Sequence, residues 1–252
     1  MKVLGIIPAR YGSSRLPGKP LKDICGKPMI QHVYERACRA EVIDNVVVAT
    51  DDQRIVDVVH AFGGEAAMTR ADHPTGSDRI AEIAQNYDCD IIVNIQGDEP
   101  LIMPEIIDEI AEALICDNTR VMATGCYKIP TEEMQKNSDV VKVVSDINGN
   151  ALLFSRSLIP YPRDLENFAA YEHIGIYAYT KAFLLTYITL PNTPLSLTES
   201  LEQLKVLENG YPIQVVHTKY EYNALSVDTQ EDLDTVIRII TEQTEQAKND
   251  DN

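Results

Sequence analysis

The N-terminal segment joins an apolar run to a loop rich in glycine and positive charge. Residues 3–7 are apolar or glycine, and residues 8–20 then include Arg10, Arg15 and Lys19 but no acidic residue. A buried strand that ends in such a loop brings backbone N–H groups and cations up to a phosphate. The loop is therefore predicted to bind a phosphate-containing ligand, and the simpler alternative is a solvated surface loop.

Two common phosphate-binding motifs do not match this loop. A Walker-type loop has four residues between its first glycine and its Gly-Lys pair, and a hydroxyl residue after the lysine. Here the residues from Tyr11 to Pro20 place five residues between Gly12 and Gly18, and Pro20 follows Lys19. The dinucleotide fingerprint G-x-G-x-x-G is also missing after the strand. We therefore expect a phosphate site of a third kind.

Two aspartates are candidate ligands of a metal ion. Asp98 follows the apolar run 91–95, and Asp228 lies in the segment 226–229. Carboxylates that face a phosphate loop are typical of a magnesium site, because Mg²⁺ takes oxygen ligands and usually keeps substrate phosphates in its shell. The simpler reading of each aspartate is a turn or helix cap.

Composition limits the class of protein. The 252 residues carry a net charge of -17, with 44% hydrophobic and 24% charged residues. This acidity argues against DNA or RNA as a partner, because nucleic-acid affinity rests on neutralising phosphates. The sequence has no signal-peptide pattern and no apolar run of about 20 residues, the length that spans a bilayer. Its five scattered cysteines fit free thiols. We expect a cytoplasmic globular protein.

The first hundred residues alternate between strand and helix patterns. Short apolar runs are separated by segments in which apolar residues recur at helical spacing, which predicts a doubly wound α/β half. Active sites of such sheets lie beyond the carboxyl ends of the strands, where the basic loop and Asp98 both fall. The predicted strands are 3–7, 46–49 and 91–95, and the predicted helices are 27–40, 52–62 and 77–86.

The pattern changes after residue 130. Residues 140–145 and 151–154 predict a hairpin closed by a type I′ turn at Asn148-Gly149. Ser196 and Glu199 have the spacing of a capping box, which predicts a helix that starts at Ser196. Further strands are expected at 174–179 and 212–218, and a closing helix at 231–246. We predict one domain over 1–252, with a doubly wound half at 1–130, a second half at 131–245 and a polar, disordered tail at 246–252.

Short segments along the whole chain resemble the 3-deoxy-manno-octulosonate (KDO) cytidylyltransferases, or CMP-KDO synthetases. The resemblance implies a Rossmann-like nucleotidyltransferase fold with a mixed, mostly parallel sheet, helices on both faces and a smaller hairpin-containing region for dimerisation and substrate binding. It also implies a bacterial cytoplasmic homodimer that uses CTP, KDO and Mg²⁺ to make CMP-KDO and pyrophosphate for lipopolysaccharide. The segments are 6–11, 15–20, 49–51, 69–73, 76–79, 96–100, 154–156, 173–177, 201–204 and 227–229.

The resemblance also implies a role for each matching residue. Arg10, Arg15 and Lys19 would hold the triphosphate and form the catalytic group together with Asp98 and Asp228, the two expected magnesium ligands. The expected CTP-binding residues are Ala9, Arg10, Gly12, Ser13, Lys19, Arg70, Ser77, Arg79, Gln96 and Asp98. The expected sugar-binding residues are Arg156, Arg163, His173, Tyr177, Glu202 and Gln203, of which Glu202 and Gln203 are predicted to point away from the core.

Three alternatives stay open. Glu172 stands where the family commonly has a basic residue, so it either faces solvent or marks a cationic substrate such as the 8-amino-8-deoxy sugar. A CMP-sialic acid synthetase is the nearest rival, but segments 96–100 and 201–204 speak against it. A catalytically silent nucleotide-binding protein is the rival from another class. Such a protein is expected to lose Lys19 or a metal carboxylate, and this chain keeps all three.

Overall fold

A computed structural model describes residues 1–12, 15–222 and 225–250, which form two compact units. We name them by their most prominent features. The loop unit comprises the described residues of 4–88, 94–104 and 223–252, and contains the basic loop. The hairpin unit comprises 1–3, 89–93 and 105–222. The predicted single domain, and its division at residue 130, stay predictions. All five cysteines are free thiols, as expected.

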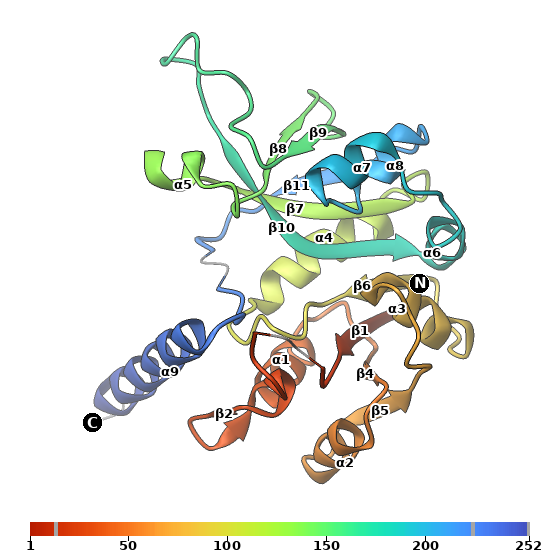
Figure 1. The fold of residues 1–252 in the computed structure, drawn as a ribbon, viewed down its shortest axis with the longest axis vertical. Helices are drawn as coiled ribbons and strands as arrows, with labels where there is room; N and C mark the ends of the chain where they lie inside the picture. The colour runs from red at the N-terminus through yellow and green to blue at the C-terminus, as the bar shows by residue number, and fades with distance from the viewer. Residues whose placement is uncertain (13–14, 223–224, 251–252) are drawn as a thin grey trace. The chain divides into compact units, whose positions relative to one another are not determined.

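The loop unit is built on parallel strands, of which the sequence predicts the first two described below but not the third, at residues 65–68. Strand β1 (Val3–Ala9) pairs with β4 (Asn45–Thr50), and β4 pairs with β5 (Glu65–Met68), all in parallel. Helices follow these strands and pack beside them, as Figure 1 shows. They are α1 (Met29–Ala37), α2 (Gln53–Ala61) and α3 (Gly76–Gln85). The predicted alternation of strand and helix in this part of the chain is confirmed.

Local capping explains where two of these helices begin. The Asp52 carboxylate accepts a hydrogen bond from the Arg54 N–H and starts α2, whereas Gly63, at φ 83°, closes its C-terminal end. Thr75 and Asp78 form a capping box that starts α3. Each cap satisfies N–H groups that a helix end leaves without a partner. Helix α3 therefore starts at Gly76, at the edge of the basic loop's strand.

An apolar cluster ties the basic loop to the C-terminal helix α9 (Gln230–Asp250). Leu16 and Met29, from the N-terminal part of the chain, pack with Val227 and Leu233 near the start of α9. Ile24, in the short strand β2 (Asp23–Ile24) that pairs with β3 (Lys27–Pro28), belongs to the same cluster. Burial of such side chains removes apolar area from water, and this is what brings two distant segments together.

Close backbone packing fixes the segment that follows β6 (Ile91–Asn94). The Ile95 N–H donates to the Ile6 carbonyl, at 3.0 Å. A Cβ on Gly97 would lie 2.7 Å from the Pro8 carbonyl oxygen, a distance that side chains do not tolerate. Only glycine therefore lets the 96–98 segment lie this close to the end of β1.

The hairpin unit contains a mixed sheet. Strand β10 (Tyr171–Thr180) pairs antiparallel with β7 (Met122–Lys128), and β11 (Gln214–His217) pairs parallel with β7. The predicted hairpin forms β8 (Lys142–Ser145) and β9 (Ala151–Ser155), and β8 joins β10. The helices of this part are α4 (Pro104–Ile115), α5 (Glu132–Lys136), α6 (Lys181–Tyr187), α7 (Pro194–Glu199) and α8 (Leu204–Glu208). Figure 1 shows α4 alongside β7 and β10.

Three local predictions were wrong, two in the hairpin unit and one at the C-terminal end of the loop unit. Asn148 does not have a positive φ and only Gly149 does, so the hairpin turn is not type I′, which needs both. The helix predicted from Ser196 begins at Pro194 with Thr193 as its cap, and it stops at Ser200, which has φ 53°. The third concerns the disordered tail expected at 246–252. Helix α9 continues through residues 246–250, and residues 251–252 lie outside the described residues.

Replacement of Gly97 by alanine should therefore destabilise the protein. The new Cβ meets a backbone oxygen, which cannot rotate away, so we expect Gly97→Ala to lower the free energy of unfolding by about 1–3 kcal/mol in urea denaturation. Gly76→Ala is the matched control, because a Cβ there meets only the Pro8 side chain, at an ordinary 3.7 Å. Equal stability of the two variants would contradict the backbone constraint at Gly97.

Candidate active site

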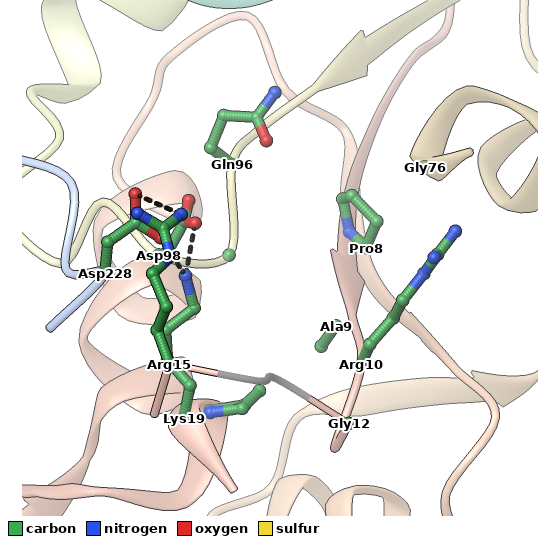
Figure 2. A pocket seen from close by; sticks show the side chains of 12 residues that line it. Pro8, Ala9, Arg10, Gly12, Arg15, Lys19, Gly76, Gln96, Asp98 and Asp228 are labelled. Carbon is green, nitrogen blue, oxygen red and sulfur yellow. Dashed lines mark hydrogen bonds and ion pairs between the residues drawn. The ribbon is translucent and has the colours of Figure 1, made fainter. Parts of the chain in front are cut away.

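A cavity of about 390 Å³ lies in the loop unit at the carboxyl end of β1. Figure 2 shows Lys19, Arg15 and two aspartates gathered on one side of it and Arg10 on the other. All five of the predicted triphosphate and metal residues line this cavity together. Its lining residues are Pro8, Ala9, Arg10, Gly12, Arg15, Lys19, Pro20, Gly76, Gln96, Gly97, Asp98 and Asp228.

Lys19 makes the central contacts of the cavity. Its ammonium Nζ donates to Asp98 Oδ2 at 2.7 Å and to Asp228 Oδ1 at 3.1 Å. The Arg15 Nη2 forms a further ion pair with Asp228 Oδ2 at 3.0 Å. Three segments that are far apart in the sequence therefore meet at one mixed cluster of charge. The backbone supports it, because the Val227 N–H donates to the Asp98 carbonyl at 2.9 Å.

The turn before Lys19 explains why its side chain reaches this position. Gly18 adopts the left-handed region at φ 67°, and its N–H donates to the Tyr11 carbonyl at 3.1 Å. A Cβ on Gly18 would lie 3.2 Å from the Tyr11 ring. The guanidinium of Arg54 stacks on that ring, 3.3 Å from its centroid. Tyr11 thus closes the loop against Gly18 and directs Lys19 inward.

Electrostatics keep Lys19 charged. Burial alone lowers the pKa of the ammonium, but the adjacent Asp98 and Asp228 carboxylates more than offset this, so the pKa of Lys19 is raised. A cation held this way neutralises carboxylates that would otherwise repel each other. With Arg10 and Arg15 also lining the cavity, the cluster suits a polyanionic ligand.

The two aspartates match the donor chemistry of Mg²⁺. Their oxygens are hard ligands, and both contact one nitrogen, so they are close enough to share one ion. In the part of the chain that the structure describes, no three His, Cys, Asp or Glu side chains form a group that could hold a metal. Two carboxylates completed by substrate phosphate oxygens are nonetheless a common way to bind Mg²⁺. The residues therefore fit the ion.

The remaining predicted CTP residues lie outside the cavity lining. Arg70 is exposed and pairs with Asp72 at 3.1 Å. Arg79 is fully buried in an ion pair with Asp51 at 3.1 Å, so its side chain braces the loop unit from within. Ser77 is buried near the start of α3. Ser13 lies outside the described residues.

Arg10 is held by a network of contacts that the sequence analysis did not predict. Its Nη2 donates to the His73 carbonyl at 3.1 Å. The His73 ring in turn contacts the Glu82 carboxylate, which also accepts the Arg70 N–H at 3.2 Å. Glu82 thereby fixes the 70–73 segment from α3. A single sequence gives no signal for this, because the interaction depends on how the loop packs.

In the hairpin unit, Arg156 is the best-anchored residue of the predicted sugar-binding set. Its Nε donates to the Glu199 carbonyl at 2.8 Å and its Nη1 to the Ser138 carbonyl at 3.1 Å. The Glu199 carboxylate also accepts the Arg156 N–H at 2.9 Å and the Ser155 hydroxyl at 2.7 Å. Glu199 therefore holds Arg156 twice, since its carbonyl accepts from the guanidinium and its carboxylate accepts from the main-chain N–H.

Lys142 is a second supporting residue, which the sequence analysis did not predict. It is fully buried, and its ammonium donates to the carbonyls of Asn137, Val140 and Arg156 at 2.6, 2.7 and 2.8 Å. Burial lowers the pKa of Lys142, and the nearby Glu172 carboxylate opposes this. One cation thus ties two loops together beside Arg156.

His173 and Tyr177 lie on β10 with their rings 5.3 Å apart. Burial lowers the pKa of His173 to about 3, so its ring is neutral, and its Nε2 lies 3.1 Å from the Thr124 hydroxyl. Burial also raises the pKa of Tyr177, and the charge of Glu202 adds to this. The Glu202 Oε2 accepts the Tyr187 hydroxyl at 3.0 Å. The structure therefore brings His173, Tyr177 and Glu202 into one neighbourhood.

Gln203 and Arg163 are the two remaining residues of the predicted sugar-binding set. Gln203 is 4% exposed, so the prediction that it points away from the core was wrong, whereas its partner Glu202 is exposed as predicted. Arg163 is exposed in the long segment between β9 and β10. Its side chain is not brought to the other residues of the set by any contact that the structure describes.

The comparisons with known proteins agree on one family. A family model described as cytidylyltransferase matches residues 4–220. A 3-deoxy-manno-octulosonate cytidylyltransferase of Geobacter metallireducens is 49% identical over 248 residues, which cover 94% of this chain and 97% of the relative. The protein of the same name from Syntrophotalea carbinolica is 52% identical over 244 residues, covering 92% and 96%. This chain belongs to the 3-deoxy-manno-octulosonate cytidylyltransferase family.

Solved structures confirm the fold. A CMP:2-keto-3-deoxy-manno-octonic acid synthetase complexed with CTP is 44% identical, with a TM-score of 0.92 over 96% of this chain and 100% of that chain. A cytidylyltransferase from Leptospira borgpetersenii is 20% identical with a TM-score of 0.63, over 97% of this chain and 96% of that one, and shares the fold alone. The predicted Rossmann-like nucleotidyltransferase fold is therefore confirmed.

Glu172, the residue that departs from the family pattern, does not simply face solvent. It is half-buried, and its carboxylate accepts a hydrogen bond from the Tyr127 hydroxyl. Burial raises the pKa of Glu172, although the Tyr127 bond and the charge of Lys142 oppose the shift. The solvent-facing interpretation was wrong because β10 pairs with β8 at this residue.

The helices of the described chain are all too short or too polar to cross a membrane. The longest of them, α9, has charged residues throughout its length.

Replacement of the buried Lys142 should cost far more stability than replacement of an exposed lysine. Lys142→Met leaves three carbonyls without a donor, so we expect the free energy of unfolding to fall by about 2–4 kcal/mol in urea denaturation. Lys136→Met is the control, because Lys136 is exposed and pairs with Glu132 at 3.3 Å across one helical turn. That loss should stay below about 0.5 kcal/mol. A similar small loss in Lys142→Met would contradict the tying role of Lys142.

Proposed function

We propose that this chain transfers CMP from CTP to the anomeric hydroxyl of KDO, giving CMP-KDO and pyrophosphate. The observation that carries the proposal is the contact of Lys19 with both Asp98 and Asp228 in a cavity lined by the motifs of this family. The substrates are supported by the names of relatives at about half identity over nearly the whole chain, and by a close structural relative described as complexed with CTP.

The reaction is a displacement at phosphorus. The sugar oxygen forms a bond to the α-phosphorus of CTP, the bond from that phosphorus to the β-phosphate oxygen breaks, and the hydroxyl proton is released to water. Pyrophosphate leaves with the bonding electron pair. The substrates are both anions, and like charges about 4 Å apart repel by about 4 kcal/mol at an effective dielectric near 20. The main task of the protein is therefore to position charges and neutralise them.

The cavity residues fit this task. Arg10, Arg15 and Lys19 would contact the triphosphate, and Gly12 and Gly97 leave room for its oxygens beside the backbone. Asp98 and Asp228 would hold Mg²⁺, which when bound withdraws charge from phosphate oxygens. In the hairpin unit, Arg156 would meet the sugar carboxylate, since a guanidinium binds carboxylates with two parallel hydrogen bonds.

Cellular context follows from the same proposal. We place the enzyme in the cytoplasm of a bacterium, in lipopolysaccharide synthesis, as a homodimer. The proposal of a dimer is supported by large apolar side chains that are exposed in the hairpin unit. Figure 1 shows that a long loop connects β9 and β10 in this unit. Apolar side chains that are exposed in one subunit can be buried at an interface with another. Those of the hairpin unit include Ile147, Leu152, Tyr161 and Leu165, which are 102%, 63%, 83% and 76% exposed.

The environment of Glu172 favours KDO over its 8-amino analogue. A carboxylate that already accepts the Tyr127 hydroxyl and faces the Lys142 charge has partners within the protein. It therefore needs no cationic group on the substrate. Faster turnover of the 8-amino-8-deoxy sugar than of KDO would reverse this preference.

The nucleotide specificity tests the proposed reaction directly. With KDO and Mg²⁺ present, we expect pyrophosphate release from CTP with a kcat/KM at least about 100-fold above that for ATP or GTP, because the family binds cytidine. Reactions without KDO give the background rate. Comparable rates with purine nucleotides, or release that does not depend on the sugar, would reject the assignment.

A double-mutant cycle tests whether Asp98 and Asp228 act as one metal site. Asparagine keeps the size of the side chain but removes the charge, so Asp98→Asn and Asp228→Asn should each lower kcat/KM by about 100-fold or more. The double variant should be no more than about tenfold worse than the poorer single variant. The measurement is kcat/KM over a magnesium titration, with melting temperatures recorded without metal to check folding. A double loss equal to the product of the single losses would mean that the carboxylates act independently.

A further inference from the structure

The two carboxylates expected to bind metal already share a cation of the protein itself. Lys19 Nζ contacts Asp98 Oδ2 at 2.7 Å and Asp228 Oδ1 at 3.1 Å, and the lysine side chain is only 14% exposed. Figure 2 shows the ammonium aimed between the two aspartates. A divalent ion shared by Asp98 and Asp228 would seek the same oxygens, and the two cations repel each other at such a distance. Metal and ammonium therefore compete for one position.

The protein offers little else to a metal at this position. Besides these aspartates, the described residues supply no third His, Cys, Asp or Glu that completes a metal-binding group. The other oxygen of Asp228, Oδ2, is paired with Arg15 at 3.0 Å. An ion that arrived alone would have to displace Lys19 and take its remaining ligands from water. An ion that arrives with phosphate oxygens brings those ligands with it, and brings negative charge that Lys19 can bind instead.

We propose that Lys19 is an internal counter-ion that weakens metal binding in the absence of nucleotide and is transferred to the triphosphate when the metal–nucleotide complex enters. This rests on the proposed function, in which Asp98 and Asp228 hold the metal and Lys19 the triphosphate. Metal and nucleotide binding are then positively coupled through one side chain. The metal takes the two carboxylates from Lys19, and the triphosphate supplies the negative charge that Lys19 binds instead.

The proposal predicts that loss of Lys19 improves metal binding. We expect the Lys19→Met variant to bind Mn²⁺ alone, without nucleotide, about tenfold more tightly than the wild type, measured by isothermal titration calorimetry and by the electron paramagnetic resonance signal of free Mn²⁺. Most substitutions in a binding site weaken binding, so the direction of this change is diagnostic. Unchanged or weaker Mn²⁺ binding by Lys19→Met would overturn the proposal.

Two further variants separate the role of Lys19 from a general effect of charge. Lys22→Met removes a positive charge three residues away whose side chain makes no ion pair within the described chain, and its Mn²⁺ affinity should stay within about twofold of the wild type. Lys19→Arg keeps the charge and should bind Mn²⁺ as weakly as the wild type does. A gain in Lys22→Met equal to that in Lys19→Met would overturn the proposal.

The same experiment distinguishes this proposal from the proposed function. Formation of CMP-KDO by the wild type tests the reaction and does not depend on Mn²⁺ affinity without nucleotide. Adding Asp98→Asn to Lys19→Met should abolish the tenfold gain, because the ion loses one of its two carboxylates. If the gain persists, Mn²⁺ binds elsewhere and the inference fails, whatever the activity of the wild type.

Discussion

The ammonium of Lys19 between two carboxylates is the interaction on which the loop unit depends. Asp98 follows β6, Asp228 precedes α9, and Lys19 ends the basic loop, so the three meet only when the unit has folded. Without a cation between them the carboxylates would repel each other in a partly buried site. The apolar cluster of Leu16, Met29 and Val227 holds the same segments together by burial of apolar side chains rather than by charge.

Glycines make that meeting possible at two points. Gly18 turns the loop through the left-handed region against the Tyr11 ring, and Gly97 lets its segment lie on the end of β1. Gly97 lacks room for a Cβ, and Gly18 has a positive φ that disfavours one, so the backbone can approach where a ligand must also approach. The backbone geometry thus forms the cavity, and the charged side chains extend into it from backbone positions that are already fixed.

The sequence predicts those parts of the structure that depend on local pattern. Apolar runs located β1, β4 and β6, and loop composition located the cavity, because a parallel sheet buries its strands and exposes their carboxyl ends. The features that the sequence did not predict depend on packing between segments that are distant in the chain. Gln203 is buried because α7 stops at Ser200 and the chain turns, and Glu172 is covered because β8 pairs beside it. Neither the end of α7 nor the pairing of β8 can be predicted from the hydrophobic periodicity around Gln203 or Glu172.

Lys142 and Lys19 together show how the nature of an acceptor determines what a charge can do. Lys142 donates to three backbone carbonyls, which are neutral, fixed in place and poor competitors for water or metal, so its contacts are permanent. Lys19 donates to two carboxylates, which carry full charge and are the ligands that a divalent ion prefers. The same ammonium group is therefore part of the framework in one unit and, in our proposal, exchangeable in the other. Under the proposed function the site admits a polyanion together with Mg²⁺, and such a site needs an exchangeable cation. A cation bound permanently would exclude the metal, and a missing one would leave the carboxylates to repel the substrate.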